Sequence, residues 1–209
     1  MTARPWFVAL EGGEGCGKST QARLLADALG GVLTREPGGT PFGVELRALL
    51  LSPSTGELDE RAELLAMNAD RAQHLAEVVR PALAAGRDVV TDRSAWSSMA
   101  YQGYGRGLPL AEVRMVCDWA AAGRWPDVVV LLDVPDAVAA ARLQGRPDRF
   151  EAEEGGFHAR VRAGFRALAA DHPESWVVVD GEGPVDVVAA AVAAAMAGRR
   201  AAEAATGRP

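Results

Sequence analysis

A glycine-rich segment, Gly12–Thr20, has the residue types of a loop that binds the phosphates of a nucleotide. It reads GGEGCGKST and fits the pattern G-x-x-x-x-G-K-[ST] between an apolar run, Phe7–Leu10, and a helical stretch. Glycines let successive backbone N–H groups face one concavity, beside the positive end of the following helix. Lys18 would reach the β- and γ-phosphates of ATP or GTP, and the Ser19 hydroxyl would be a ligand for Mg²⁺. The residues expected to bind the nucleotide are Gly12, Gly13, Glu14, Gly15, Cys16, Gly17, Lys18, Ser19 and Thr20.

The choice of basic residues singles out the same loop. Of 22 basic residues, 21 are arginine, and the single lysine is Lys18. A compact ammonium group on a thin stem differs from a planar guanidinium fork, so a position that keeps lysine has a reason to do so. A simpler interpretation is that the composition favours arginine and that Lys18 is a lysine without a special role. The position of Lys18 inside the loop argues against this interpretation.

Length and charge exclude several classes of protein. A chain of 209 residues with 49% hydrophobic and 24% charged residues suits one globular domain over 1–209. The net charge of −6 argues against nucleic-acid binding. No apolar run is long enough to cross a bilayer and no signal-peptide pattern is present, so we expect no membrane association and a cytoplasmic location. Cys16 and Cys117 are expected to be reduced thiols.

Short apolar runs alternate with longer helical stretches along the chain. This pattern predicts an α/β fold built on a parallel sheet. Parallel strands need crossover connections, and the helical stretches between the runs supply them. The strands are expected at Phe7–Leu10, Val32–Thr34, Asp88–Thr91, Val128–Asp133 and Trp176–Asp180.

The helical stretches and the loops between them complete the outline. Helices are expected at Leu58–Ala85, Leu110–Ala122 and Pro184–Ala197, and after Glu154. The last of these should bury one face, formed by Phe157, Val161, Phe165 and Leu168. Residues 143–156 combine Gly, Pro and charge, which predicts a mobile loop, called the lid below. Residues 199–209 are expected to fray.

Four further motifs lie beyond the glycine-rich loop. They are TREPGGT (Thr34–Thr40), ELRALLL (Glu45–Leu51), NADRAQH (Asn68–His74) and DRSAWSSMAYQGYGRG (Asp92–Gly107). In this order and spacing the chain resembles bacterial thymidylate kinases from Phe7 to about residue 180. The resemblance is specific, because R-E-P-G-G-T and Y-Q-G-x-G-R-G are not general features of phosphate-binding loops.

The resemblance implies a P-loop nucleoside-monophosphate kinase fold, in which helices flank a five-stranded parallel sheet and a short lid is present. It also implies that ATP phosphorylates dTMP with the help of Mg²⁺. Members of this family are homodimers through long helices. The stretch Leu58–Ala85 carries apolar residues on more than one face, in keeping with that arrangement.

The resemblance assigns roles residue by residue. Asp92 matches a residue that organises magnesium and water, and Arg93 matches one that bridges the two phosphates. Arg47 matches an arginine that holds the dTMP phosphate, and Arg71 one that hydrogen-bonds the thymine. Tyr101 matches a tyrosine that crowds the 2′ position of the sugar. The expected dTMP contacts are Glu14, Pro37, Arg47, Met67, Arg71, Arg93, Ser98, Tyr101 and Gln102, and the expected metal ligands are Ser19 and Asp92.

Gly15 carries an implication for catalysis. In the family that this chain resembles, a glycine at this loop position goes with a transition-state arginine supplied by the lid. Three arginines lie before or within the lid: Arg142, Arg146 and Arg149. Arg149, in the run D-R-F-E, is the best placed by motif, but the sequence does not rank the three. We expect catalysis by Lys18, Arg93 and one or more of these lid arginines.

Met67 leaves a second function open. The family usually places an aromatic residue near this position to stack on thymine, and the run Leu64–Asn68 contains none. A kinase for another nucleoside monophosphate is therefore an alternative. A nucleotide-sensing switch is a further one, although the guanine motif N-K-x-D is impossible in a chain with one lysine. The three histidines, His74, His158 and His172, lie in polar helical surroundings and are expected at the surface.

Overall fold

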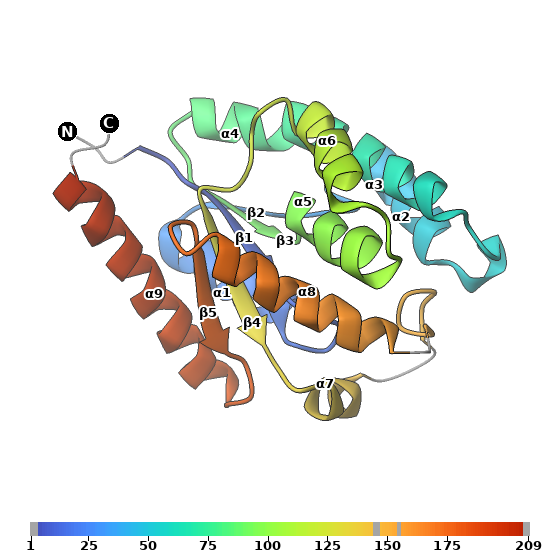
Figure 1. Cartoon of the computed structure of the whole chain (residues 1–209). Helices are drawn as coiled ribbons and strands as arrows, with labels where there is room; N and C mark the ends of the chain where they lie inside the picture. The colour runs from blue at the N-terminus through green and yellow to red at the C-terminus, as the bar shows by residue number, and fades with distance from the viewer. Residues whose placement is uncertain (1–3, 144–146, 154–155, 207–209) are drawn as a thin grey trace.

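A parallel β-sheet forms the centre of the molecule (Figure 1). The computed structural model of the chain describes residues 4–143, 147–153 and 156–206. Its five strands lie in the order β2-β3-β1-β4-β5, and every neighbouring pair is parallel. The strands are β1 (Phe7–Glu11), β2 (Val32–Arg35), β3 (Val89–Asp92), β4 (Val128–Asp133) and β5 (Trp176–Asp180). The predicted α/β class, parallel sheet and strand positions are confirmed.

The apolar run of β4 shows why these residues form a central strand. Val128, Val130 and Leu132 belong to the hydrophobic core on one face of the sheet. Val129 and Leu131 belong to the core on the other face. Successive side chains of a strand point to opposite faces, so a continuous apolar run fits a strand that is covered on both sides.

Helices cover both faces of this sheet (Figure 1). Two helices, α1 (Lys18–Leu29) and α9 (Val185–Thr206), pack together on one face. The other face carries α5 (Ala95–Ser98), the π-helical segment η3 (Met99–Gly105), α6 (Leu110–Ala121) and α8 (Phe157–Asp171). The face predicted for α8 is buried in this second core, as expected. Two shorter helices are α2 (Pro41–Leu51) and α7 (Asp136–Arg142), with a single turn, η1 (Pro53–Thr55), after α2.

One long helical stretch spans the region predicted as Leu58–Ala85. It consists of α3 (Glu60–His74), a π-helical turn, η2 (Leu75–Val79), and α4 (Arg80–Ala84). The side chain of Asp59 accepts hydrogen bonds from two backbone N–H groups at the start of α3, which is the role of an N-cap residue. Pro81 has no N–H to donate to the preceding turn, which fits the widened π-helical turn before it.

The C-terminal helix α9 is longer than predicted. It continues beyond Ala197 to Thr206, so the frayed end expected for residues 199–209 is wrong for 199–206. The reason is a set of contacts with the other end of the chain: Glu203 accepts hydrogen bonds from Arg4 at 2.7 Å and from the Trp6 indole at 2.8 Å. Within the described ranges, no helix is both long and apolar enough to cross a membrane.

The lid connects α7 with α8. Within it the structure describes residue 143, residues 147–153, which form turns, and residue 156. The backbone N–H of Arg149 donates to the carbonyl of Leu51 at 3.1 Å. Phe150 is only 4% exposed and belongs to the same core as α8. The middle of the lid therefore rests on the C-terminal end of α2.

Candidate active site

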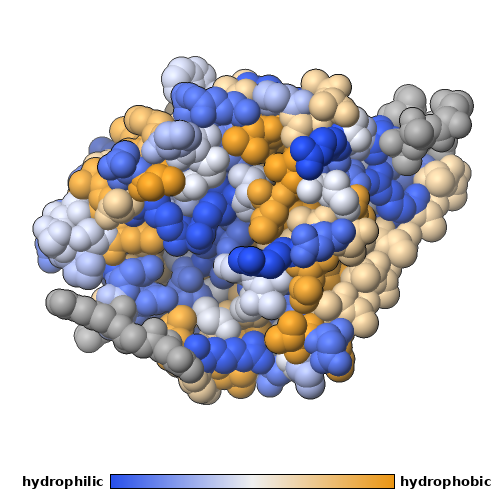
Figure 2. All heavy atoms as spheres, turned by 180° about the vertical axis from the view of Figure 1, so that it is seen from behind, coloured by the Kyte–Doolittle hydropathy of each residue, from blue (hydrophilic) through white to orange (hydrophobic). Residues whose placement is uncertain are grey.

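A pocket lies at the carboxyl ends of the central strands. It has a volume of about 440 Å³ and is bordered by the segments that follow β1, β2 and β3. Ligands of open α/β sheets bind at this edge. In Figure 2, hydrophilic residues gather around a hollow in one face of the molecule. Most of the residues predicted to act together line this pocket: Glu14, Gly15, Gly17, Lys18, Ser19, Thr20, Pro37, Arg47, Met67, Arg71, Asp92, Arg93, Ser98, Tyr101, Gln102 and Arg142.

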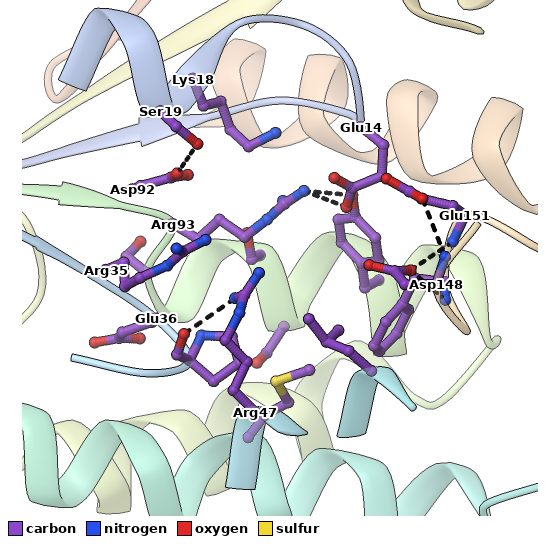
Figure 3. Close-up of a pocket in the computed structure, with 18 of the residues that line it drawn as sticks. Glu14, Lys18, Ser19, Arg35, Glu36, Arg47, Asp92, Arg93, Asp148 and Glu151 are labelled. Carbon is purple, nitrogen blue, oxygen red and sulfur yellow. Dashed lines mark hydrogen bonds and ion pairs between the residues drawn. The ribbon is translucent and has the colours of Figure 1, made fainter. Parts of the chain in front are cut away.

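The glycine-rich loop turns directly from β1 into α1. Gly15 and Gly17 have φ angles of 72° and 94°, a region that glycine enters without strain. Lys18 is the first residue of α1, and its ammonium group donates to the Gly13 carbonyl at 2.6 Å. The loop thus presents a helix N-terminus and a cation to the pocket (Figure 3). Gly12, Gly13 and Cys16 instead line a smaller cavity of about 210 Å³ on the other side of the loop, which Glu14 also borders.

Gly15 is required by packing as well as by its backbone angle. A Cβ atom added there would collide with the carbonyl oxygen of Ala139 in α7. A residue with a side chain at this position would have to displace α7. The structure therefore gives a steric reason for Gly15, in addition to the absence of a side chain that reaches a phosphate.

Ser19 and Asp92, the predicted metal ligands, are in contact. The Ser19 hydroxyl donates to the Asp92 carboxylate, where α1 begins and β3 ends. Hydroxyl and carboxylate oxygens suit Mg²⁺, which keeps most of its remaining ligands as water and nucleotide phosphate. No group of three or more His, Cys, Asp or Glu side chains forms a metal cage in the described part of the chain. The two oxygens of Ser19 and Asp92 are of the kind that Mg²⁺ takes as protein ligands when a nucleotide and water supply the others.

Arg93 combines a strained backbone with several side-chain contacts. Its φ angle of 73° lies in the left-handed region, which is uncommon for a residue with a side chain and clusters at functional sites. The guanidinium donates to the carboxylate of Glu14, to the Tyr101 hydroxyl at 2.8 Å and to the Gly12 carbonyl at 3.1 Å. Arg93 is thus held between the glycine-rich loop and η3.

Glu14 is ionised by its neighbours. Burial raises the pKa of the Glu14 carboxyl, but the charges of Arg93 and Lys18 and a hydrogen bond from Tyr101 outweigh burial and lower the pKa to about 2. Burial also raises the pKa of the Tyr101 phenol well above its usual value, so its hydroxyl stays protonated and donates to Glu14 at 2.8 Å. The pocket therefore contains a fixed carboxylate acceptor beside its arginines.

Several cations share one part of the pocket. Figure 3 shows Lys18 on one side, Arg47 on the other, and Arg35 and Arg93 between them. Burial lowers the pKa of the Arg47 guanidinium, and repulsion from Arg35 and Arg93 lowers it further. A bound anion would relieve this repulsion. Arg35 was not predicted as a site residue, although it lies within the motif Thr34–Thr40.

Arg71 is held rigidly at the floor of the pocket. It is 3% exposed, and its guanidinium donates to Glu36 at 2.9 Å and to the Ser98 hydroxyl at 3.1 Å. His74 is fully buried and binds the other carboxylate oxygen of Glu36 at 2.9 Å and Thr34 at 2.7 Å. The expectation that His74 lies at the surface is wrong, because its partners are more than 35 residues away in the sequence.

The three lid arginines have different surroundings. Arg142 lines the pocket, and its guanidinium donates to the carbonyls of Gly181 and Glu182 at 2.9 and 2.8 Å. Arg146 lies outside the described residues. Arg149 is not part of the pocket lining; it pairs with Glu63 at 2.7 Å. The pocket lining also includes residues that were not predicted from the sequence, namely Arg35, Glu36, Leu51, Ser94, Ser97, Asp148, Phe150 and Glu151.

Comparisons with known proteins all give the same family. The family model described as thymidylate kinase matches residues 10–192. A thymidylate kinase of Leifsonia xyli subsp. xyli is 50% identical over 207 residues, which cover 95% of this chain and 98% of that protein. One of Solidesulfovibrio magneticus is 50% identical over 200 residues, 89% of this chain and 96% of that protein. The crystal structure of thymidylate kinase from Ehrlichia chaffeensis aligns with a TM-score of 0.78 at 30% identity, over 93% of this chain and 99% of that chain. This likeness confirms the kinase fold that the sequence motifs implied.

Proposed function

Because the chain belongs to the thymidylate kinase family, we propose that it transfers the γ-phosphoryl group of ATP to dTMP, giving ADP and dTDP. The observation that carries this proposal is the arrangement of cations in one pocket, where Arg47 faces Lys18 of the phosphate-binding loop and Arg93 lies between them (Figure 3). Such a pocket suits two phosphorylated ligands in line. Both cysteines are free, in keeping with a reducing compartment such as the cytoplasm.

The chemistry needs positioning and charge rather than a general base. The phosphate of dTMP has a second pKa of about 6, so it is largely ionised at neutral pH and already nucleophilic. The site has to hold two anions that repel each other and to stabilise the charge on the phosphoryl group in transit. We assign Lys18 to the phosphates of ATP, Arg47 to the phosphate of dTMP and Arg93 to both.

Ser19 and Asp92 are the residues that would hold the metal ion of MgATP. When bound, Mg²⁺ neutralises charge on the β- and γ-phosphates. Asp92 already accepts a hydrogen bond from the Ser19 hydroxyl, so the two oxygens are positioned together before the nucleotide arrives.

The acceptor nucleoside is assigned to the other end of the pocket. Arg71, fixed by Glu36 and Ser98, presents its guanidinium edge to the base. The hydrogen-bonded pair of Glu14 and Tyr101 lies beside Arg93 and is placed to contact the sugar. Pro37, Met67 and Gln102 also line this part, which completes the set of contacts that the family resemblance implies.

A lid arginine is proposed to stabilise the transition state. Arg142 already lines the pocket, and Arg146 follows it in the sequence, outside the described residues. We assign this role to Arg142 or Arg146, since Gly15 supplies no cation from the loop. Closure of the lid would also exclude water from the reacting group.

An assay of ADP release with a panel of nucleoside monophosphates tests the proposal. dTMP should be the preferred acceptor, and dUMP should be weaker, because a missing methyl group costs about 1–3 kcal/mol in an apolar pocket. Equal turnover of dTMP and AMP would instead support a kinase for another base. Nucleotide binding without any phosphoryl transfer would support a switch.

We also propose that two copies of the chain associate through α2, α3 and α6. α3 packs against both of the other helices. These helices expose large apolar side chains, namely Phe42, Val44, Leu49, Leu65, Met115 and Trp119. Light scattering should give the mass of a dimer, and the variant Leu65→Glu should give a monomer. A monomeric wild-type protein at micromolar concentration would contradict this assignment.

A further inference from the structure

A buried carboxylate connects the lid to the acceptor half of the pocket. Glu63 on α3 is fully buried. It accepts hydrogen bonds from Gln102 at 2.8 Å and from Arg106 at 3.0 Å, and it forms an ion pair with Arg149 at 2.7 Å. A buried carboxylate is costly unless it is paired and fully hydrogen-bonded, and these three partners satisfy both of its oxygens.

Arg149 is attached to α2 as well. Its side-chain Nε–H donates to the carbonyl of Leu50 at 2.8 Å, and its backbone N–H donates to the carbonyl of Leu51 at 3.1 Å. The last carbonyls of a helix lack partners within the helix, and a cation there is favourable. Arg149 therefore fastens the middle of the lid to α2 and α3 at the same time.

Phe150 is placed in the pocket by these contacts. Its ring packs beneath the guanidinium of Arg149, 4.5 Å from the ring centroid, and lies edge to face with Tyr101 at 5.7 Å. It lines the pocket together with Leu51 and Met67, and these three residues form the apolar wall of the acceptor half. Phe150 supplies the aromatic ring of that wall, where Met67 supplies only a thioether.

We propose that Glu63 and Arg149 are positioning residues that hold Phe150 in the apolar wall, where its ring packs on the base of the acceptor nucleotide. This inference rests on the proposed function of the pocket. In this proposal Arg149 positions Phe150 and does not stabilise the transition state. The transition-state role belongs to Arg142 or Arg146. Phe150 thereby becomes a determinant of acceptor selectivity that belongs to the lid.

The test compares Phe150→Leu with Arg149→Met in steady-state kinetics, with dTMP and ATP varied separately. Both variants should raise the KM for dTMP by about 3- to 10-fold, the range of an aromatic contact, and leave kcat and the KM for ATP within about twofold. The double variant should be no worse than the more affected single variant, because both changes remove the same contact. Arg149→Lys, which keeps the charge toward Glu63, should recover part of the loss.

Arg4→Met is the matched control. It also breaks an arginine–carboxylate pair, with Asp127 and Glu203, but before the start of β1, at the end of the sheet away from the pocket. It should lower the thermal unfolding temperature without changing the KM for dTMP. A purely structural role of Arg149 predicts the same result for Arg149→Met and would overturn the proposal.

Two other outcomes would also overturn it. If Arg149→Met lowered kcat by about 10²-fold or more and left the KM for dTMP unchanged, Arg149 would be a transition-state group. An unchanged KM for Phe150→Leu would remove the ring from acceptor binding. Failure of the proposed function itself would appear in the wild-type protein, as the absence of dTMP turnover. The same variants would then be measured with the nucleotide that the panel identifies.

Discussion

The two halves of the pocket are built in different ways. The half proposed to bind the phosphates of ATP, called the phosphate half, comes mainly from six residues of the loop Gly12–Thr20 and from the pair Asp92 and Arg93 at the end of β3. The acceptor half is assembled from α2, α3, η3 and the lid, which are spread over about 100 residues of the chain. Local backbone geometry therefore sets the positions of the side chains in the phosphate half, whereas tertiary packing sets those in the acceptor half.

The two halves also hold their charges differently. Lys18 makes its shortest contact with a backbone carbonyl, within the loop that it serves. Arg71 depends on side chains from two other elements, Glu36 and Ser98. A substitution in the phosphate half should therefore act directly on one group, whereas a substitution in the acceptor half should also act through its neighbours.

The largest effect should come from the phosphate half, at Lys18. Lys18→Ala should lower kcat by about 10²-fold or more, because it removes a preorganised cation from the transferring phosphate. The thermal unfolding temperature should change little. Arg23→Ala, an exposed arginine on the same helix, is the matched control and should retain activity. Near-normal turnover of Lys18→Ala with an intact unfolding transition would contradict the assignment of the loop.

Two glycines of the same loop allow a sharper test of local geometry. Gly15→Ala should lower kcat/KM for ATP by about 10-fold or more, since a left-handed alanine costs about 1–2 kcal/mol and its Cβ meets the Ala139 carbonyl. Gly13→Ala should have the smaller effect, because nothing lies within 4 Å of its Cβ position. Steady-state kinetics with ATP varied measures both. Equal losses would show that the approach of α7 to the loop is unimportant.

The sequence predicts the phosphate half better than the acceptor half for this same reason. The strands and the glycine-rich loop follow from contiguous residues, and the sheet confirms them. His74, Phe150 and Glu63 depend on partners dozens of residues away, so neither periodicity nor motif spacing reveals them. The end of α9 was misjudged likewise, because its partners come from the opposite end of the chain.

A smaller effect is expected in the acceptor half, at Met67. If Phe150 supplies the ring of the apolar wall, Met67→Phe should leave the KM for dTMP within about twofold, because no aromatic contact is missing. Kinetics with dTMP varied, beside Phe150→Leu as the reference, measures this. A clear fall in the KM for dTMP in Met67→Phe would show that stacking is what the wild-type pocket lacks. It would then place the base nearer to α3 than to the lid.

Two carboxyl groups, one in the phosphate half and one beneath the acceptor half, have pKa values shifted in opposite directions. Glu14, in the phosphate half, is ionised beside Arg93 and has a pKa of about 2. Asp70, beneath the acceptor half, is fully buried, and burial together with repulsion from Glu36 raises its pKa to about 6, although the Gly38 N–H donates to it at 2.9 Å. Its second oxygen has no hydrogen-bond partner among the described residues.

The last prediction concerns stability rather than kinetics and follows from Asp70. Between pH of about 4 and about 6, Asp70 loses its proton in the unfolded chain but keeps it in the folded protein. The free energy of unfolding therefore falls as pH rises through this range, by up to about 3 kcal/mol. Asp70→Asn keeps an acceptor for the Gly38 N–H but cannot ionise. The variant should therefore gain stability relative to wild type between pH of about 4.5 and about 7, as measured by thermal unfolding at both values. If the unfolding temperatures of the two proteins changed with pH in parallel, ionisation of Asp70 would not destabilise the folded state. The acceptor half would then be as open to solvent as the phosphate half.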